Sequence, residues 1–141
     1  SDCLYWCHAI SGRGHGRFYV GTLPAGKGAE QRDLCMIAHR FGYALVYGAD
    51  ALRQVPVLGH GCDNPLCQRI GPGHVQPSSH AQNRRAYLAR RFVAGSPLGD
   101  ARGARGRSRQ LRDLSRAEPA AVAAEQARLL RLGLQLALFE T

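Results

Sequence analysis

The sequence predicts a small α+β domain, followed by a basic arm and a C-terminal helix. Its length of 141 residues suits one domain with an appendage, and its content of 45% apolar and 21% charged residues is close to that of globular proteins. All cysteines and histidines lie before residue 95. We therefore expect a folded domain over residues 1–94, an arm over residues 95–116 and a helix over residues 117–141.

The first half of the domain shows one strand pattern and one helix pattern. Residues 17–23 (RFYVGTL) follow a glycine-rich turn and are typical of a strand. Apolar residues then recur at helical spacing between residues 33 and 47. This half is therefore predicted to hold a strand over 17–23 and a helix over 33–47.

The second half of the domain alternates short apolar pieces with a polar loop. Extended segments are expected over residues 55–60, ending at His60, and around Val75. Ser79 begins a further helix that runs to about residue 93, because Gln82 three residues later completes the spacing of a capping box. The predicted order is strand, cysteine-containing loop, strand and helix.

The segment 95–116 differs from the domain in its charge. It holds six arginines against two aspartates, few apolar side chains and interspersed glycines, which is typical of a flexible basic arm. From Glu118 onward alanine and leucine predominate, and Pro119 suits the first turn of a helix. This helix carries leucines on nearly every side, so its surface must pack on the domain or on a second chain.

Four of the five cysteines form two close pairs, Cys3 with Cys7 and Cys62 with Cys67, near histidines. This pattern favours metal binding in a reducing compartment over disulfides. Cys62, Cys67 and His74 lie within thirteen residues and are ligand types of tetrahedral zinc. Their loop is rich in Gly, Pro and Asn, so a metal cross-link is expected to fix its shape, with a fourth ligand from elsewhere in the chain.

The pattern His60-x-Cys62-x4-Cys67, followed by His74 and later by Asn83, resembles a known family. It is similar to the active-site and zinc pattern of the His-Me finger (ββα-metal) endonucleases, and most similar to the His-Cys box and zinc-containing HNH homing-type nucleases. Upstream, CLYW (3–6) resembles the family's Cys-x-x-Trp, GHGRF (14–18) its Gly-Tyr-Gly-Arg-Phe turn and AHR (38–40) its Ala-His-Arg helix segment. The resemblance covers about residues 3–91.

The resemblance implies a zinc-stabilised ββα-metal fold and a hydrolytic site. It makes His60 the general base and Asn83 the ligand of a catalytic Mg²⁺, and it makes Cys3, Cys62, Cys67 and His74 the structural Zn²⁺ site. An imidazole is a suitable proton acceptor near neutral pH, and an amide oxygen suits a hard divalent cation. The implied activity is hydrolysis of DNA phosphodiester bonds to 5′ phosphate and 3′ hydroxyl ends, in homing, restriction or phage DNA processing.

Two assignments stay open at this level. Cys7 and His8 are alternatives to Cys3 as the fourth zinc ligand. An arginine that would stabilise the charge of the transition state is assigned to Arg32, but the region 27–32 does not align cleanly, so Lys27 and Arg17 also remain candidates. The zinc loop is longer than is usual for the family, because Gly71-Pro-Gly73 precedes His74.

Double-stranded DNA is the expected partner. The chain carries a net charge of +9, and residues 84–116 contribute +8 of it, from ten arginines and two aspartates. We expect a two-fold homodimer with the helix over residues 117–141 as its dimerisation element, because two copies that face a palindromic site would cut both strands. The arginines expected to contact DNA are Arg84, Arg85, Arg90 and Arg91 in the helix and Arg102, Arg105, Arg107 and Arg109 in the arm.

The sequence also limits location and leaves alternatives for function. It has neither an apolar stretch of membrane-spanning length nor the pattern of a secretory signal, so we expect a cytoplasmic protein without membrane association. Its 18 arginines against one lysine, with abundant Gly, Ala and Leu, suggest a high-GC genome, so we expect a bacterial or phage origin. One alternative function is a zinc-stabilised DNA-binding module that does not cleave. Another is a nickase or a ribonuclease on the same fold.

Overall fold

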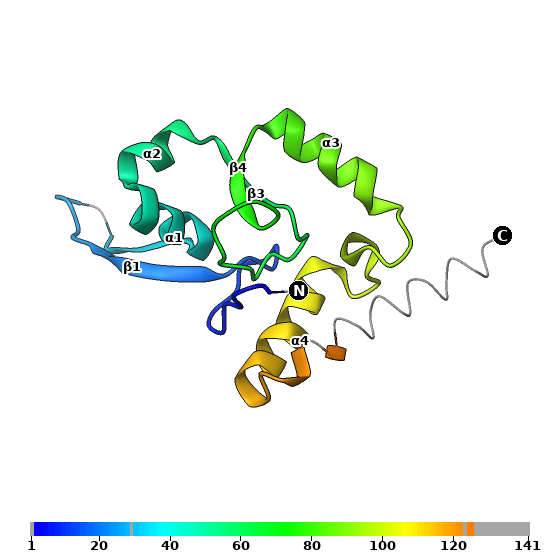
Figure 1. Ribbon diagram of the computed structural model, residues 1–141. Coiled ribbons are helices and arrows are strands. Elements are labelled where there is room, and N and C mark those ends of the chain that lie inside the picture. The colour runs from blue at the N-terminus through cyan, green and yellow to red at the C-terminus, as the bar shows by residue number, and fades with distance from the viewer. Residues whose placement is uncertain (1, 29, 123, 126–141) are drawn as a thin grey trace.

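The computed structural model describes residues 2–28, 30–122, 124 and 125 (Figure 1). It is a small mixed α+β fold with two separate two-stranded antiparallel sheets, as predicted for the fold class. The elements in chain order are β1 (Arg17–Leu23), β2 (Arg32–Ile37), α1 (Ala38–Tyr47), α2 (Ala49–Gln54), β3 (Val57–His60), β4 (Val75–Ser78), α3 (His80–Arg91), the 3-10 turn η1 (Pro97–Gly99) and α4 (Gly103–Ala117). In the described part of the chain, none of the helices has the length and hydropathy needed to cross a membrane.

The first sheet corrects one prediction. β1 pairs with β2 from Arg17 opposite Ile37 to Leu23 opposite Arg32, with an irregular register between Tyr19 and Gly21. The strand over 17–23 is confirmed, but the helix predicted from residue 33 begins only at Ala38. Short apolar runs fit both periodicities, and here hydrogen bonds to β1 decide the conformation of residues 32–37.

The second sheet and α3 follow the predicted order. β3 pairs with β4 from Val57 opposite Ser78 to His60 opposite Val75. α3 begins after Ser79, whose hydroxyl accepts a hydrogen bond from the Gln82 backbone N–H at 3.1 Å. The Gln82 side chain in turn accepts one from the Ser79 N–H at 2.9 Å, so the predicted capping box is present.

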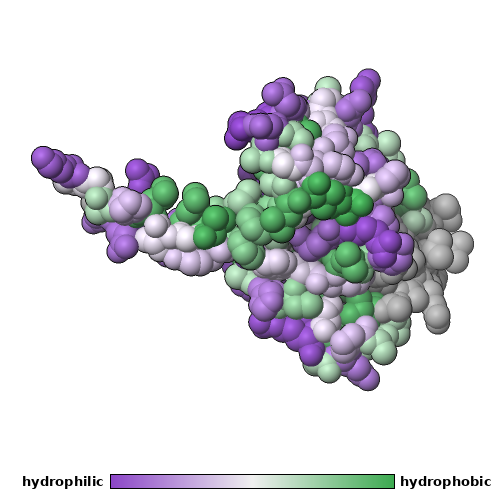
Figure 2. Space-filling model, turned by 60° about the vertical axis from the view of Figure 1, so that its left-hand side comes forward, coloured by the Kyte–Doolittle hydropathy of each residue, from purple (hydrophilic) through white to green (hydrophobic). Residues whose placement is uncertain are grey.

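Two small apolar clusters hold these elements together. Tyr43, Leu58 and Val75 join α1 to the second sheet, and Leu66, Leu111 and Val122 join the loop after β3 to the C-terminal part of the chain. Large apolar side chains such as Leu45 remain exposed, and the side of the molecule turned forward in Figure 2 shows apolar patches between hydrophilic ones. Cores this small leave a chain dependent on additional cross-links.

Helix α4 (Gly103–Ala117) corrects a second prediction, because residues 95–116 were expected to be a flexible arm. The helix buries Ser108 and Leu111. A Cβ atom at Gly14 would lie 2.7 Å from the Ser108 Oγ, so α4 packs directly on the glycine-rich turn before β1. The residues that stabilise α4 lie far away in the sequence. Local composition does not contain these contacts, and it therefore indicated a flexible arm. The leucine-rich segment predicted to form the dimerisation helix lies mostly outside the described residues.

Candidate functional site

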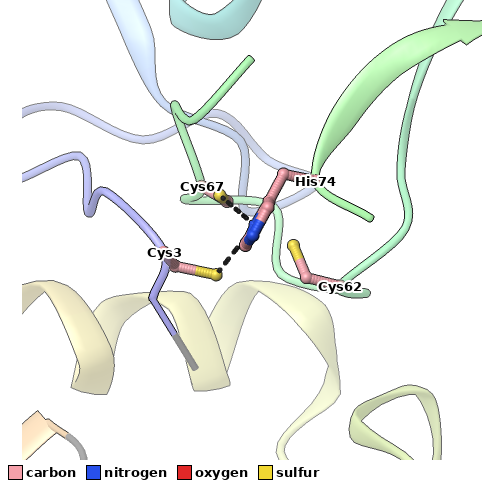
Figure 3. A group of neighbouring side chains, drawn as sticks. All are labelled: Cys3, Cys62, Cys67 and His74. Atoms are coloured by element: carbon pink, nitrogen blue, oxygen red, sulfur yellow. Dashed lines mark hydrogen bonds between the residues drawn. The ribbon is translucent and has the colours of Figure 1, made fainter. Parts of the chain in front are cut away.

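Four side chains predicted to bind zinc come together. The ligand atoms of Cys3, Cys62, Cys67 and His74 all lie within 4.8 Å of one another. The His74 Nδ1 is 3.5 Å from the Cys67 Sγ and 3.8 Å from the Cys3 Sγ, and all four side chains converge on one point (Figure 3). Three thiols and one imidazole are a donor set of structural zinc sites, so the residues present fit this metal.

Backbone pairing brings Cys3 to the loop after β3. Tyr5 forms an antiparallel bridge with Cys67, the Trp6 N–H donates to the Leu66 carbonyl at 2.9 Å, and the Gln68 N–H donates to the Leu4 carbonyl at 2.7 Å. The N-terminal segment therefore lies antiparallel along residues 66–68.

The alternative fourth ligands do not join the cluster. The Cys7 thiol donates to the Tyr5 carbonyl at 3.4 Å, and His8 is exposed. Among the described residues the group that could hold a metal contains neither of them. Cys3 is therefore the fourth member of the cluster.

The loop that carries the cysteines closes on itself through its backbone. The Gly61 N–H donates to the His74 carbonyl at 2.8 Å, and a Cβ atom at Gly61 would lie 2.8 Å from the Gly73 carbonyl carbon. Asp63 adopts a φ of 51°, and the buried Asn64 side chain accepts from the Leu66 N–H at 3.1 Å. Close backbone contact at Gly61 thus holds Cys62 and His74 on facing sides of the loop.

The electrostatics of the cluster favour a bound cation. Hydrogen bonding with Cys3 and Cys67, together with burial, raises the pKa of the Cys62 thiol, and contact with Cys3 raises that of Cys67. Crowded thiols resist ionisation because thiolates repel one another, and a divalent ion removes that repulsion. The second ring nitrogen of His74 is 3.0 Å from the Asp2 carboxylate, an outer contact that commonly orients metal-binding histidines.

His60 ends β3 two residues before Cys62 and lies among other histidines. Its ring centroid is 4.5 Å from that of His39 and 5.6 Å from that of His15. Both His60 ring nitrogens are buried and have no hydrogen-bond partner among the described residues. Burial, followed by the charge of His15, lowers the pKa of His60 to about 4, although Cys3 opposes the shift. Burial also lowers the pKa of His39 to about 2.

Asn83 lies in the first turn of α3 and faces β3. A Cβ atom at Gly59 would lie 3.2 Å from the Asn83 Oδ1, so this amide oxygen lies beside the backbone of the residue that precedes His60. The helix thus brings the Asn83 side chain to the part of β3 that ends at His60. Asn83 as a whole residue is exposed.

No family model, curated protein or solved structure matches the chain.

The structure does not bring Arg32 to the histidines. Arg32 lies opposite Leu23, whereas Arg17 lies at the other end of β1, two residues after His15. Six residue steps along a strand span about 20 Å. Lys27 lies in the connection between the two strands, beyond Leu23. Of the three candidate cations, Arg17 is thus closest along the sheet to the histidine cluster.

Three of the eight arginines predicted to contact DNA have partners within the chain. Arg90 donates to both carboxylate oxygens of Asp63, at 2.7 and 2.8 Å. Arg107 is buried and donates to the Asp63 carbonyl at 3.2 Å, and Arg102 pairs with Asp100 and Glu125. The other five predicted arginines are exposed and form no ion pair within the described part of the chain: Arg84, Arg85, Arg91, Arg105 and Arg109.

Sequence reasoning missed four residues around the site. Asp2 contacts His74, Asp63 binds an arginine from each of two helices, and His15 and His39 surround His60. The two histidines lie inside GHGRF and AHR, the segments that carry the resemblance, so a signal for them was present. Nothing local identifies Asp2 or Asp63, because their partners lie elsewhere in the chain.

Proposed function

We propose that the protein is a divalent-metal-dependent DNA endonuclease of the ββα-metal type. One observation carries the proposal: the amide oxygen of Asn83 in α3 lies beside the backbone of Gly59, the residue before His60, and His60 is two residues from Cys62 of the Cys/His cluster. A phosphodiester hydrolase needs a proton acceptor and a cation ligand on two sides of one reacting phosphate. An antiparallel hairpin followed by a helix supports that arrangement here.

The Cys/His cluster would hold a structural Zn²⁺. When bound, the ion supplies a cross-link among the N-terminal segment, the loop after β3 and the residue before β4. Because His60 is only two residues from Cys62, fixing the loop also fixes the end of β3. The zinc ligands thus position the proposed base without taking part in hydrolysis.

In this proposal His60 accepts a proton from the attacking water. Both of its ring nitrogens are buried without a partner among the described residues, and an unsatisfied buried polar group costs about 1–3 kcal/mol. Such a cost contributes nothing to folding. It is typical of residues that serve a reaction at the expense of stability.

Asn83 would hold the catalytic cation. Mg²⁺ prefers oxygen donors and keeps several waters, taking further ligands from the substrate phosphate, so one amide oxygen from the protein is compatible with it. When bound, the ion would supply charge neutralisation at the phosphate and the leaving oxygen.

Arg17 at the start of β1 is the leading candidate for contacting the same phosphate, ahead of Arg32.

Duplex DNA is the proposed substrate. Arg84, Arg85 and Arg91 are exposed on α3, the helix that carries Asn83, and Arg91 lies over the Tyr87 and Phe92 rings at 5.7 and 5.3 Å. These side chains place positive charge next to the proposed reacting phosphate. Cleavage of both strands would use two copies of the chain.

One observation favours a second candidate, a DNA-binding module that does not cleave. A general base must contact the water that it activates, and both His60 ring nitrogens are closed off from solvent. In that case the zinc site and the arginines would serve binding only. The two candidates differ in whether the wild-type protein cuts DNA.

The test is incubation of the zinc-loaded protein with supercoiled plasmid DNA and Mg²⁺, followed by electrophoresis of the products. We expect nicked and linear DNA from the wild type and none from His60→Ala, which should still bind one zinc per chain and the same DNA. His8→Ala, which changes an exposed histidine outside the cluster, is the matched control and should cut normally. Cleavage by His60→Ala would rule out the role of His60. Binding without cleavage by the wild type would establish the second candidate.

A further inference from the structure

Helix α4 has an inward face and an outward face of different character. Arg107, Ser108 and Leu111 are buried against the rest of the chain. Successive residues of an α-helix turn by about 100°, so the outward arginines fall within a band of about 60° that is about 16 Å long. We call this band the arginine ridge; its members are Arg105, Arg109, Arg112 and Arg116.

Most of the arginine ridge has no ion-pair partner among the residues that the structure describes. Arg105, Arg109 and Arg116 are exposed, and none of them forms an ion pair with another residue that the structure describes. Arg112 pairs with the neighbouring Asp113 at 2.8 Å. Three positive charges with no acidic partner in the described part of the chain therefore lie in line on one side of α4.

The ridge is held in place at three points. Ser108 packs on Gly14, Leu111 packs in the cluster with Leu66, and the buried Arg107 donates to the Asp63 carbonyl. A ridge that is already ordered loses less conformational entropy on binding than a flexible arm would.

We propose that the arginine ridge binds the phosphate backbone of duplex DNA, as a contact separate from the arginines of α3. The choice of DNA rests on the proposed function. Each strand of a duplex presents a phosphate about every 3.4 Å along the axis, so a ridge of about 16 Å can reach several phosphates in a row. A helix that binds a membrane surface turns its apolar face to the lipid. Here Leu111 and its neighbour Leu114 pack into the protein, which leaves an outward face suited to phosphates.

Asp63 connects the ridge to α3. Its carboxylate accepts two hydrogen bonds from Arg90 of α3, and its carbonyl accepts one from Arg107 of α4. In Figure 1 the loop that follows β3 lies between these two helices. Both basic surfaces are thus attached to one residue of the loop, so the ridge extends the contact with DNA beyond the proposed cleavage site.

The experiment measures binding, without added Mg²⁺, of a synthetic DNA duplex by fluorescence anisotropy at NaCl concentrations from about 50 to 200 mM. The triple variant Arg105→Gln, Arg109→Gln, Arg116→Gln removes three charges. Each phosphate contact contributes about 0.9 to the slope of log K against log salt, so the slope should become shallower by about 2.7. The same three positions changed to Lys should keep the wild-type slope. This variant distinguishes the loss of charge from damage to the helix.

A single pair of variants provides the matched control. Arg109→Gln should make the slope of log K against log salt shallower by about 0.9. Arg53→Gln, at an exposed arginine of α2, should leave this slope unchanged. An unchanged slope in the triple glutamine variant would overturn the proposal, as would ridge-dependent binding to anionic phospholipid vesicles that is tighter than binding to the duplex. A wild type that binds through the ridge but does not cut plasmid would refute the nuclease and leave the ridge intact. Plasmid cleavage by the wild type, together with a salt slope that the ridge substitutions do not change, would support the nuclease and overturn the ridge.

Discussion

The two arginine-bearing helices, α3 and α4, are held to the molecule in different ways. α3 buries no residue and is fixed at its start by the capping box around Ser79 and near its end by the pair between Arg90 and Asp63. α4 has no side-chain cap but buries Leu111 in an apolar cluster. The basic composition of the two segments is similar, so composition alone does not reveal which side chains anchor a helix and which face solvent.

Metal removal should have the largest effect on stability. It should also affect α3 and α4 differently. Structural zinc contributes about 10–16 kcal/mol of apparent binding free energy in small domains, so chelation or Cys67→Ser should unfold the loop after β3 and release α3. Thermal unfolding followed by circular dichroism, with and without chelator, measures the effect. Cys35→Ser, in β2 and outside the cluster, is the control and should keep one zinc per chain. A melting temperature that ignores the chelator would contradict the structural role.

Leu111→Ala should have the next largest effect, and it acts on α4. Truncating a fully buried leucine typically costs about 2–5 kcal/mol, because apolar contacts are lost and a cavity remains. Urea unfolding measures the loss, and zinc content should stay the same.

Leu88→Ala on α3 is the matched variant for that experiment. This leucine is 50% exposed, so its truncation should change the free energy of unfolding by less than about 0.5 kcal/mol. Equal losses from the two leucines would show that α3 is packed as deeply as α4, contrary to the structure.

Ser79→Ala should have a smaller effect than Leu111→Ala, and this effect should be confined to α3. Loss of the N-cap hydroxyl exposes an unpaired backbone N–H and costs about 1 kcal/mol. Amide hydrogen exchange should therefore accelerate in α3 and stay unchanged in α4. His80→Ala, in the first helical position, leaves both bonds of the capping box in place and should not accelerate exchange. Uniform acceleration in both helices would indicate that the cap supports the whole fold.

The sequence predicted those parts of the fold that short-range patterns determine. β1, the β3–loop–β4–α3 order and the Ser79 cap each depend on residues close together in the chain. β2 and α4 were missed, because β2 forms by pairing with β1 and α4 by packing on Gly14 and Leu66, contacts that no local window contains.

The same distinction applies to the candidate site. Cys62, Cys67 and His74 were found from their spacing, and Cys3 through the resemblance. Arg102 and Arg107 were assigned to DNA because their sequence surroundings are basic, whereas their partners are Asp100, Glu125 and the Asp63 carbonyl. The roles of Asp2 and Asp63 depend on distant partners in the same way, so only the folded chain reveals them.

Gly61 has a consequence for how this protein can change over evolutionary time. No side chain fits there, because a single methyl group would meet the Gly73 backbone at 2.8 Å. Any substitution at Gly61 would force the two sides of the loop apart. It would move the His60 imidazole and the Cys62 thiol at the same time, because these residues flank Gly61. A lineage can therefore exchange surface arginines gradually, one tolerated step at a time, whereas position 61 offers no gradual route.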